Sequence, residues 1–193
     1  MTRFEFLMMI AAVVVAVGMT EIVGGWGRLM RTRAVVKADW LHLGWSIWIL
    51  AILIQYWIGM WAYNQLQIDY MGQIFFLIIP TLFGVLAAFA ITPDVPMAGE
   101  LDVREYYWAK RTAVFLPLAA FSLLTYVADL VIVGVDKVGF DLMFINVVGM
   151  VLLILLTITK RLWFHVAVLG CVAANTIAFL FKHSSSLGTK WAG

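Results

Sequence analysis

The chain is poor in charged residues. Only 12% of its 193 residues are Asp, Glu, Lys or Arg, whereas 64% are hydrophobic, and the mean hydropathy is +1.00. A typical soluble domain has about 25% charged residues, so this chain has about half the charge needed to cover a surface in water. The composition excludes an ordinary soluble enzyme and a disordered chain, and it predicts an integral membrane protein.

Cysteine and catalytic motifs are also scarce. Cys171 is the single cysteine, so neither an intrachain disulfide nor a cysteine metal cluster can form. The net charge of +2 is too small to attract a polyanion, which excludes a nucleic-acid partner. Phosphate-binding glycine loops, zinc-binding His-Glu-x-x-His helices and Gly-x-Ser-x-Gly elbows are missing. We therefore expect no enzyme activity, no metal and no cofactor, apart from the haem alternative below.

Long apolar runs fill most of the sequence. Crossing a bilayer core of about 30 Å takes about 20 residues of helix. Six runs meet this length: 7–27, 41–63, 74–92, 112–133, 142–159 and 162–181. With only short connectors between them, they predict one transmembrane domain over 1–193, an all-α six-helix bundle. Its two halves of three spans could be inverted, a layout found among transporters, although they share no motif.

Basic residues are distributed unequally between the two sides of this predicted bundle. One side has nine (Arg28, Arg31, Arg33, Lys37, Arg104, Lys110, Arg111, Lys160, Arg161) and the other has four (Arg3, Lys137, Lys182, Lys190). Because Lys and Arg favour cytoplasmic connectors, we expect both termini on the non-cytoplasmic side of a bacterial inner membrane.

The longest connector differs from the others in composition. Pro93 and Pro96 interrupt the chain, and residues 100–111 mix charges with aromatic side chains. This pattern predicts a short interfacial helix that runs into the fourth span, with its aromatic residues among lipid headgroups. The aromatic residues are Tyr106, Tyr107 and Trp108; a solvated loop is the alternative.

Glu21 is the deepest formal charge in the predicted spans. An acid at bilayer depth costs about 2.5–3.5 kcal/mol, so it should face protein or water. Arg28 follows on the same face two turns later, about 10.8 Å along the axis, and we expect no direct ion pair between them. Glu21 is therefore a candidate proton site. Its alternative is a structural role, either a hydrogen bond to a neighbouring helix or a pair with an arginine.

Small residues surround Glu21 on the first span. Small side chains let another helix approach closely, which drives association in lipid. The predicted packing residues are Gly18, Thr20, Gly24 and Gly25.

Further polar residues are scattered through the other spans. His42 is a candidate proton partner of Glu21. Four residues are expected in the outer halves of their spans, where they could line an outward-facing cavity: Gln55, Asp129, Asn146 and Asn175. The alternative for Gln55, Asn146 and Asn175 is a hydrogen bond between helices, worth about 0.6 kcal/mol. The alternative for Asp129 is a solvated helix end.

Two histidines occupy matched depths. His42 and His165 lie just inside the same ends of their spans, as axial ligands of a b-type haem would. Bulky neighbours such as Trp163 and Phe164 argue against a haem pocket.

The sequence thus favours a small channel-like or transporter-like protein with a proton site at Glu21. The first alternative is a non-catalytic subunit of a larger membrane complex, and the second is a haem electron-transfer protein. The expected partners are the lipid bilayer and either further copies of the chain or a larger membrane-protein complex.

Overall fold

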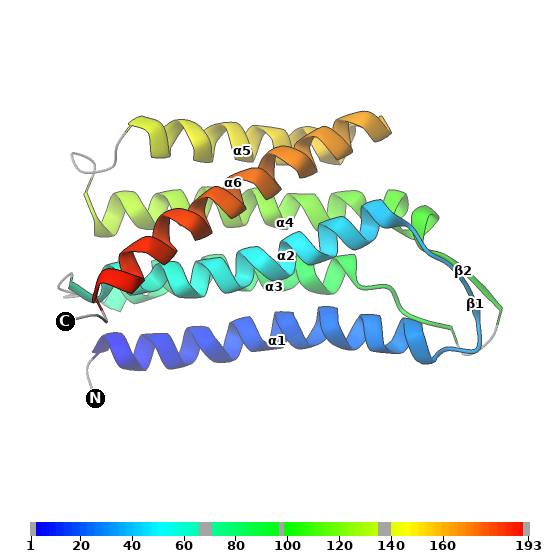
Figure 1. The fold of residues 1–193 in the computed structure, drawn as a ribbon, viewed down its shortest axis with the longest axis horizontal. Helices are drawn as coiled ribbons and strands as arrows, with labels where there is room; N and C mark the ends of the chain where they lie inside the picture. Colours follow the sequence, from blue (N-terminus) through cyan, green and yellow to red (C-terminus); the bar gives the residue numbers. More distant parts are fainter. Residues whose placement is uncertain (1–2, 66–70, 97–98, 135–139, 191–193) are drawn as a thin grey trace.

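The computed structural model describes residues 3–65, 71–96, 99–134 and 140–190, which form an elongated helical bundle (Figure 1). It is 86% helical, which confirms the all-α class. A 3-10 helix, η1, continues α2, and two three-residue strands lie at one end. The elements in chain order are α1 (Arg3–Arg31), β1 (Val35–Lys37), α2 (Trp40–Gly59), η1 (Met60–Gln65), α3 (Met71–Ile91), β2 (Glu100–Asp102), α4 (Val103–Ile132), α5 (Phe140–Ile158) and α6 (Leu162–Lys190).

Five helices are long and apolar enough to cross a membrane, which is consistent with an integral membrane protein. They are α1, α2, α3, α4 and α6. In α5 the described apolar stretch, Phe144–Ile158, is shorter. Each predicted apolar run falls on one helix to within one residue, except that the run 41–63 ends within η1.

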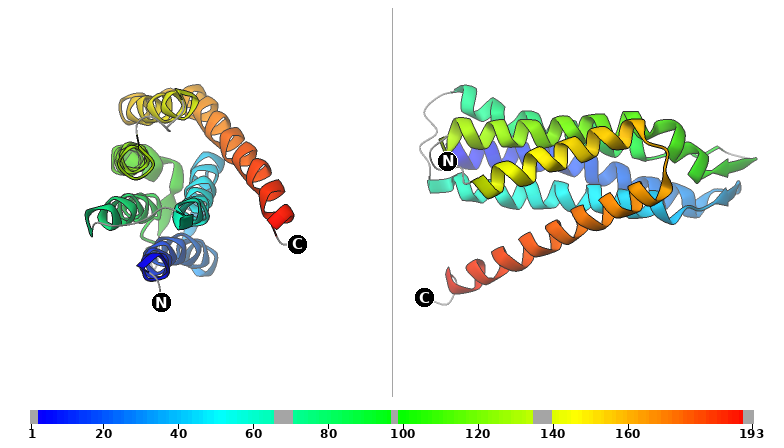
Figure 2. Two further views of the ribbon diagram at one scale, coloured as in Figure 1. Left: turned by 90° about the vertical axis from the view of Figure 1, so that its left-hand side faces the viewer. Right: turned by 90° about the horizontal axis from the view of Figure 1, so that it is seen from above.

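The helices pack side by side around aromatic and aliphatic side chains. α1 contacts α2 and α3, α3 contacts α4, and α4 contacts α5. α6 contacts α2 and α5, then leans away from the other helices toward its C-terminal end (Figure 2). In the main core, the ring of Trp45 on α2 lies 4.7 Å from that of Phe115 on α4, centroid to centroid, and both side chains are fully buried. Such edge-to-face pairs add to the stabilisation that burial provides.

Both chain ends lie at the same end of the bundle. α1 begins and α6 finishes there, and the α1–α2, α3–α4 and α5–α6 connections lie at the opposite end (Figure 1). We call this opposite end the basic end, because it holds the nine Lys and Arg residues that the sequence places on one side.

The α3–α4 connection differs from the expected interfacial helix. Residues 100–102 form strand β2, which pairs in parallel with β1, and the helix that follows is continuous with α4. Asp102 sets this start, because its side chain accepts hydrogen bonds from the backbone N–H groups of Arg104 and Glu105. Val35 and Val36 suit the extended conformation of β1, but a pairing between two distant connectors leaves no local pattern in the sequence.

Candidate functional site

Glu21 forms an ion pair on its own helix. Its Oε1 atom lies 2.5 Å from Nη2 of Arg28, and the two side chains are 23% and 48% exposed. The expectation that two turns of helix separate them too far is therefore wrong. Helical side chains lean toward the N-terminus of their helix, so the long Arg28 side chain runs back along α1 and spans the gap.

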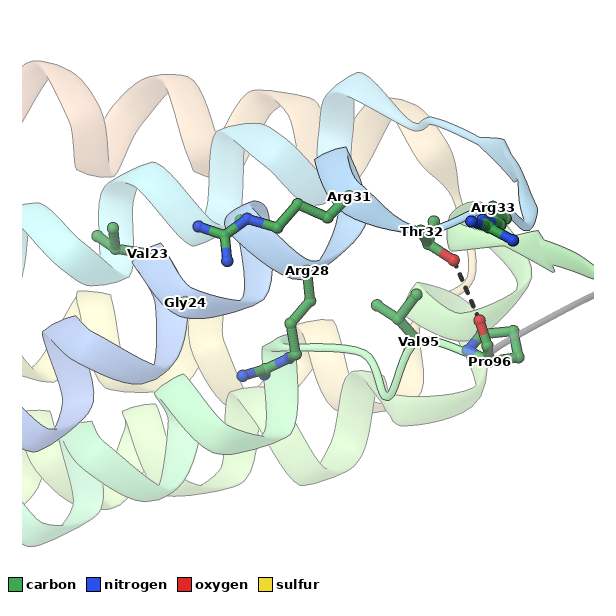
Figure 3. A pocket seen from close by; sticks show the side chains of 9 residues that line it. Val23, Gly24, Arg28, Arg31, Thr32, Arg33, Val95 and Pro96 are labelled. Atoms are coloured by element: carbon green, nitrogen blue, oxygen red, sulfur yellow. Dashed lines mark hydrogen bonds between the residues drawn. The ribbon is translucent and has the colours of Figure 1, made fainter.

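A pocket of about 690 Å³ lies at the basic end, between the end of α1 and the segment that follows α3 (Figure 3). Two glycines of α1 leave room for it: a Cβ atom on Gly24 would lie 3.6 Å from Nη1 of Arg28, and one on Gly27 would meet nothing within 4 Å. The lining residues are Val23, Gly24, Gly27, Arg28, Arg31, Thr32, Arg33, Val95 and Pro96.

Hydrogen bonds and strand pairing join the two walls of the pocket. The hydroxyl of Thr32 donates to the carbonyl oxygen of Pro96 at 3.1 Å, the dashed line in Figure 3, and accepts from the N–H of Ala34. Just beyond, the N–H of Val35 donates to the carbonyl oxygen of Gly99, where β1 and β2 begin to pair. Gly99 has a φ of +99°, a left-handed conformation that glycine adopts without strain. The opposite wall is thus held against the end of α1.

The pocket is strongly cationic. Three guanidinium groups line it, and the carboxylate of Glu21 is paired with that of Arg28. Within the described ranges, Arg31 and Arg33 form no ion pair. The nearby Lys37 is paired with Glu100, whose hydrogen bond and charge raise the pKa of the Lys37 ammonium.

The small residues of α1 separate into two groups. Gly18 and Gly25 are buried, and a Cβ on Gly25 would collide with Thr92 at the end of α3. A Cβ on Gly18 would lie 3.0 Å from Leu53 and 3.1 Å from Val85. Thr20 is exposed and Gly24 faces the pocket. Gly18 and Gly25 therefore allow α1 to pack closely against α2 and α3 of the same chain.

His42 and His165 are both buried and both hydrogen-bonded. Nε2 of His42 lies 2.6 Å from the carbonyl oxygen of Ile91. The two ring nitrogens of His165 contact the hydroxyl of Tyr107, at 2.5 Å, and the carbonyl oxygen of Thr159, at 2.8 Å. A haem iron would have to displace one of the two partners of His165, so this residue does not fit axial ligation. In the described part of the chain, no three His, Cys, Asp or Glu side chains come together as metal ligands would.

The three interfacial aromatic residues have different surroundings. Tyr107 is fully buried, against the expectation that it lies among headgroups, because its hydroxyl reaches His165 inside the bundle. The Tyr106 hydroxyl lies 2.9 Å from the carbonyl oxygens of Ala90 and Thr92 at the end of α3. Trp108 is half-buried beside His165.

At the end opposite the basic end, Asp129 has a partner that the sequence did not suggest. Its carboxylate accepts a hydrogen bond from the hydroxyl of Tyr63. The Oε1 atom of Gln55 is buried without a hydrogen-bond partner in the part that the structure describes.

The other two residues of the expected outer cavity belong to α5 and α6. The backbone carbonyl oxygen of Asn146 lies 3.4 Å from the hydroxyl of Ser122, and Asn175 is exposed on α6. The structure brings Glu21 into direct contact with Arg28, and both residues were singled out by the sequence.

Comparison of the chain with protein-family models, with curated proteins and with solved structures finds no match. The functional argument therefore depends on the geometry of the site itself.

Proposed function

We propose that the chain is a small channel-like or transporter-like protein of a bacterial inner membrane, and that Glu21 is its proton site. The observation that carries this proposal is the Glu21–Arg28 ion pair beside the cationic pocket. The pair places a titratable carboxylate in contact with one of the three guanidinium groups that line the pocket.

The pair would have two states, with Glu21 either ionised or protonated. When Glu21 is ionised, it holds Arg28 and neutralises part of the charge in the pocket. When Glu21 takes up a proton, the attraction is lost and Arg28 is free to bind an anion. Binding of a proton to Glu21 therefore favours binding of an anion to Arg28, and the reverse holds equally, because the coupling of two binding events is reciprocal. This coupling is what a proton-linked anion carrier requires.

The proposal includes six crossings, with both termini on the non-cytoplasmic side and the halves α1–α3 and α4–α6 inverted. It is supported by the position of both chain ends opposite the basic end (Figure 1). An even number of crossings returns the chain to the side on which it started. The concentration of basic residues at the other end agrees with their preference for cytoplasmic connectors.

The test is anion-dependent proton flux into liposomes that contain the purified protein. Glu21→Gln keeps the shape of the side chain but neither titrates nor attracts Arg28 as an anion does. We expect this variant to fold and to lose the dependence of flux on pH. Glu105→Gln is the matched control, because Glu105 is an exposed carboxylate near the start of α4 and lies outside the pocket. Unchanged flux in Glu21→Gln, or no flux in the parent at any pH, would contradict the proposal.

A second candidate function is that of a subunit that packs against other membrane helices. The divergence of α6 favours it (Figure 2). Ile177, Leu180 and Phe181 are 53%, 45% and 74% exposed on this helix. Helix association in lipid depends on close packing, and further copies of the chain could supply it here. Native mass spectrometry of protein released from nanodiscs tests this candidate: a single copy without any partner would contradict it.

A further inference from the structure

We propose that the pocket at the basic end binds a phosphate group through Arg28, Arg31 and Arg33. The inference shares Arg28 with the proposed function, and it names the chemical class of the ligand. A phosphate can reach this position as the headgroup of an anionic phospholipid or as a free phosphate compound.

The arginines surround one space. Arg28 and Arg31 are three residues apart on the last turns of α1 and so share a face of the helix, and Arg33 follows just after the helix ends. In Figure 3, the Arg31 side chain runs back along α1, the Arg28 side chain projects downward from the helix, and Arg33 lies beside Thr32. All three line the same pocket. A preference of basic residues for one side of the membrane explains their number at this end, but it does not require them to face one cavity.

The charge in this space is only partly neutralised within the described residues. Glu21 pairs with Arg28 alone, and neither Arg31 nor Arg33 has an ion-pair partner. Guanidinium groups bind phosphate through two parallel hydrogen bonds, a geometry that a lysine ammonium does not offer. Several such groups around one cavity therefore favour a phosphate over a halide ion.

The remaining lining suits an organic group attached to the phosphate. Val23, Val95 and Pro96 form an apolar wall opposite and beside the arginines. A volume of about 690 Å³ is within the range of about 300–1,000 Å³ typical of small-molecule sites, which is more than a single phosphate ion fills.

The pocket is also formed in advance of binding. The Thr32–Pro96 hydrogen bond and the β1–β2 pairing hold its two walls together without a ligand. A preformed site loses less conformational entropy when the ligand binds. In a membrane, the end of α1 would lie near the headgroups, since the apolar run 7–27 ends just before Arg28. Basic pockets at this level are suited to lipid headgroups.

The experiment measures binding of the probe directly and does not depend on transport activity. The full chain is placed in phosphatidylcholine nanodiscs, and its melting temperature is followed while either dioctanoyl phosphatidylglycerol or inorganic phosphate is added. We expect the melting temperature to rise with at least one of them. A response to the lipid alone identifies a headgroup site, and a response to inorganic phosphate identifies a site for free phosphate compounds.

Variants decide whether the pocket is responsible. Removing one guanidinium group should weaken binding about fivefold to tenfold, so the double variant Arg31→Gln, Arg33→Gln should bind at least an order of magnitude more weakly. Arg161→Gln is the matched control, because it removes an exposed arginine at the same end of the bundle but in the α5–α6 connection. Absence of a response to both probes would overturn the proposal. The proposal would also be overturned if the melting temperature of the double variant still rose as much as that of the parent. The same would follow if Arg161→Gln lost the rise to the same extent as the double variant.

Glu21→Gln separates this inference from the proposed function. If Glu21 competes with the phosphate for Arg28, the variant binds the probe more tightly than the parent does. Binding in a parent that shows no flux would leave the phosphate site standing and end the transport proposal. Proton flux in a parent that binds neither probe would leave the transport proposal standing and end the phosphate-site proposal.

Discussion

The hydroxyl of Tyr107 on α4 lies 2.5 Å from Nδ1 of His165 on α6, inside a cluster of aromatic rings. The rings of Trp108 and Phe115 stand edge to face with the imidazole, at centroid distances of 4.8 and 5.6 Å. This contact is a buried polar link between α4 and the helix that leans away from the bundle. It therefore holds the start of α6 in place.

We expect Tyr107→Phe to destabilise the protein by about 1–3 kcal/mol, because the ring is kept while a buried hydrogen-bond partner of His165 is lost. The measurement is reversible unfolding in detergent. Tyr126→Phe provides the comparison, and we expect it to change stability by less than about 0.5 kcal/mol. Equal stability of the two variants would show that the Tyr107–His165 contact contributes nothing.

Gly25 and Gly27 offer a matched pair on one helix. In Gly25→Ala the new methyl group would collide with Thr92, which is buried and held by a hydrogen bond to Ala88. We expect a loss of about 1–3 kcal/mol, as for other overpacked sites. In Gly27→Ala the methyl group enters open space, and the higher helix propensity of alanine should add up to about 1 kcal/mol of stability. Melting temperatures that move in the same direction for both variants would contradict this packing of α1 against α3.

Asp102 should determine where α4 begins. Its carboxylate accepts hydrogen bonds from the N–H groups of Arg104 and Glu105 at 2.9 and 3.0 Å. Asp102→Ala should therefore cost about 1 kcal/mol, whereas Asp102→Asn, which is an equally good N-cap, should cost little. Chemical denaturation of the two variants tests the difference, and a large loss in Asp102→Asn would point instead to a role for the charge.

The proposed orientation can be tested in intact cells. The background variant is Cys171→Ala, because the single native cysteine is exposed on α6. In this background we expect Ser185→Cys to react with a membrane-impermeant thiol reagent and Arg31→Cys to remain unlabelled. Labelling of Arg31→Cys alone would mean that the basic end faces outward.

The positions of the helices could be predicted because each is marked by its own apolar run. The run 162–181 starts at Leu162 and so does α6, and the run 41–63 starts one residue after α2 does. Hydrophobic length is a local property of the chain. It indicates where a helix lies before anything is known of its neighbours.

The contacts of the site could be predicted far less well. Tyr107 and His165 are 58 residues apart, and the pairing of β1 with β2 joins connectors on either side of a helical hairpin. Such contacts depend on how the helices pack, which a single sequence does not display. The Glu21–Arg28 pair is a different case. The spacing is visible in the sequence, but the axial distance alone does not predict the contact, because the length and direction of the arginine side chain also determine it.

If the proposed orientation and the proposed phosphate site are correct, the three pocket arginines act at two successive stages of synthesis. Arg28, Arg31 and Arg33 leave the ribosome well before Val95 and Pro96, because α2 and α3 lie between them in the chain. While α1 is being inserted, these arginines have no opposite wall, and in the orientation proposed above they would act as a retention signal for the cytoplasmic side. Only when β2 has emerged and paired with β1 do the same side chains become the lining of a cavity. A substitution among them would then alter biogenesis as well as binding, so the orientation of each variant is measured alongside its affinity.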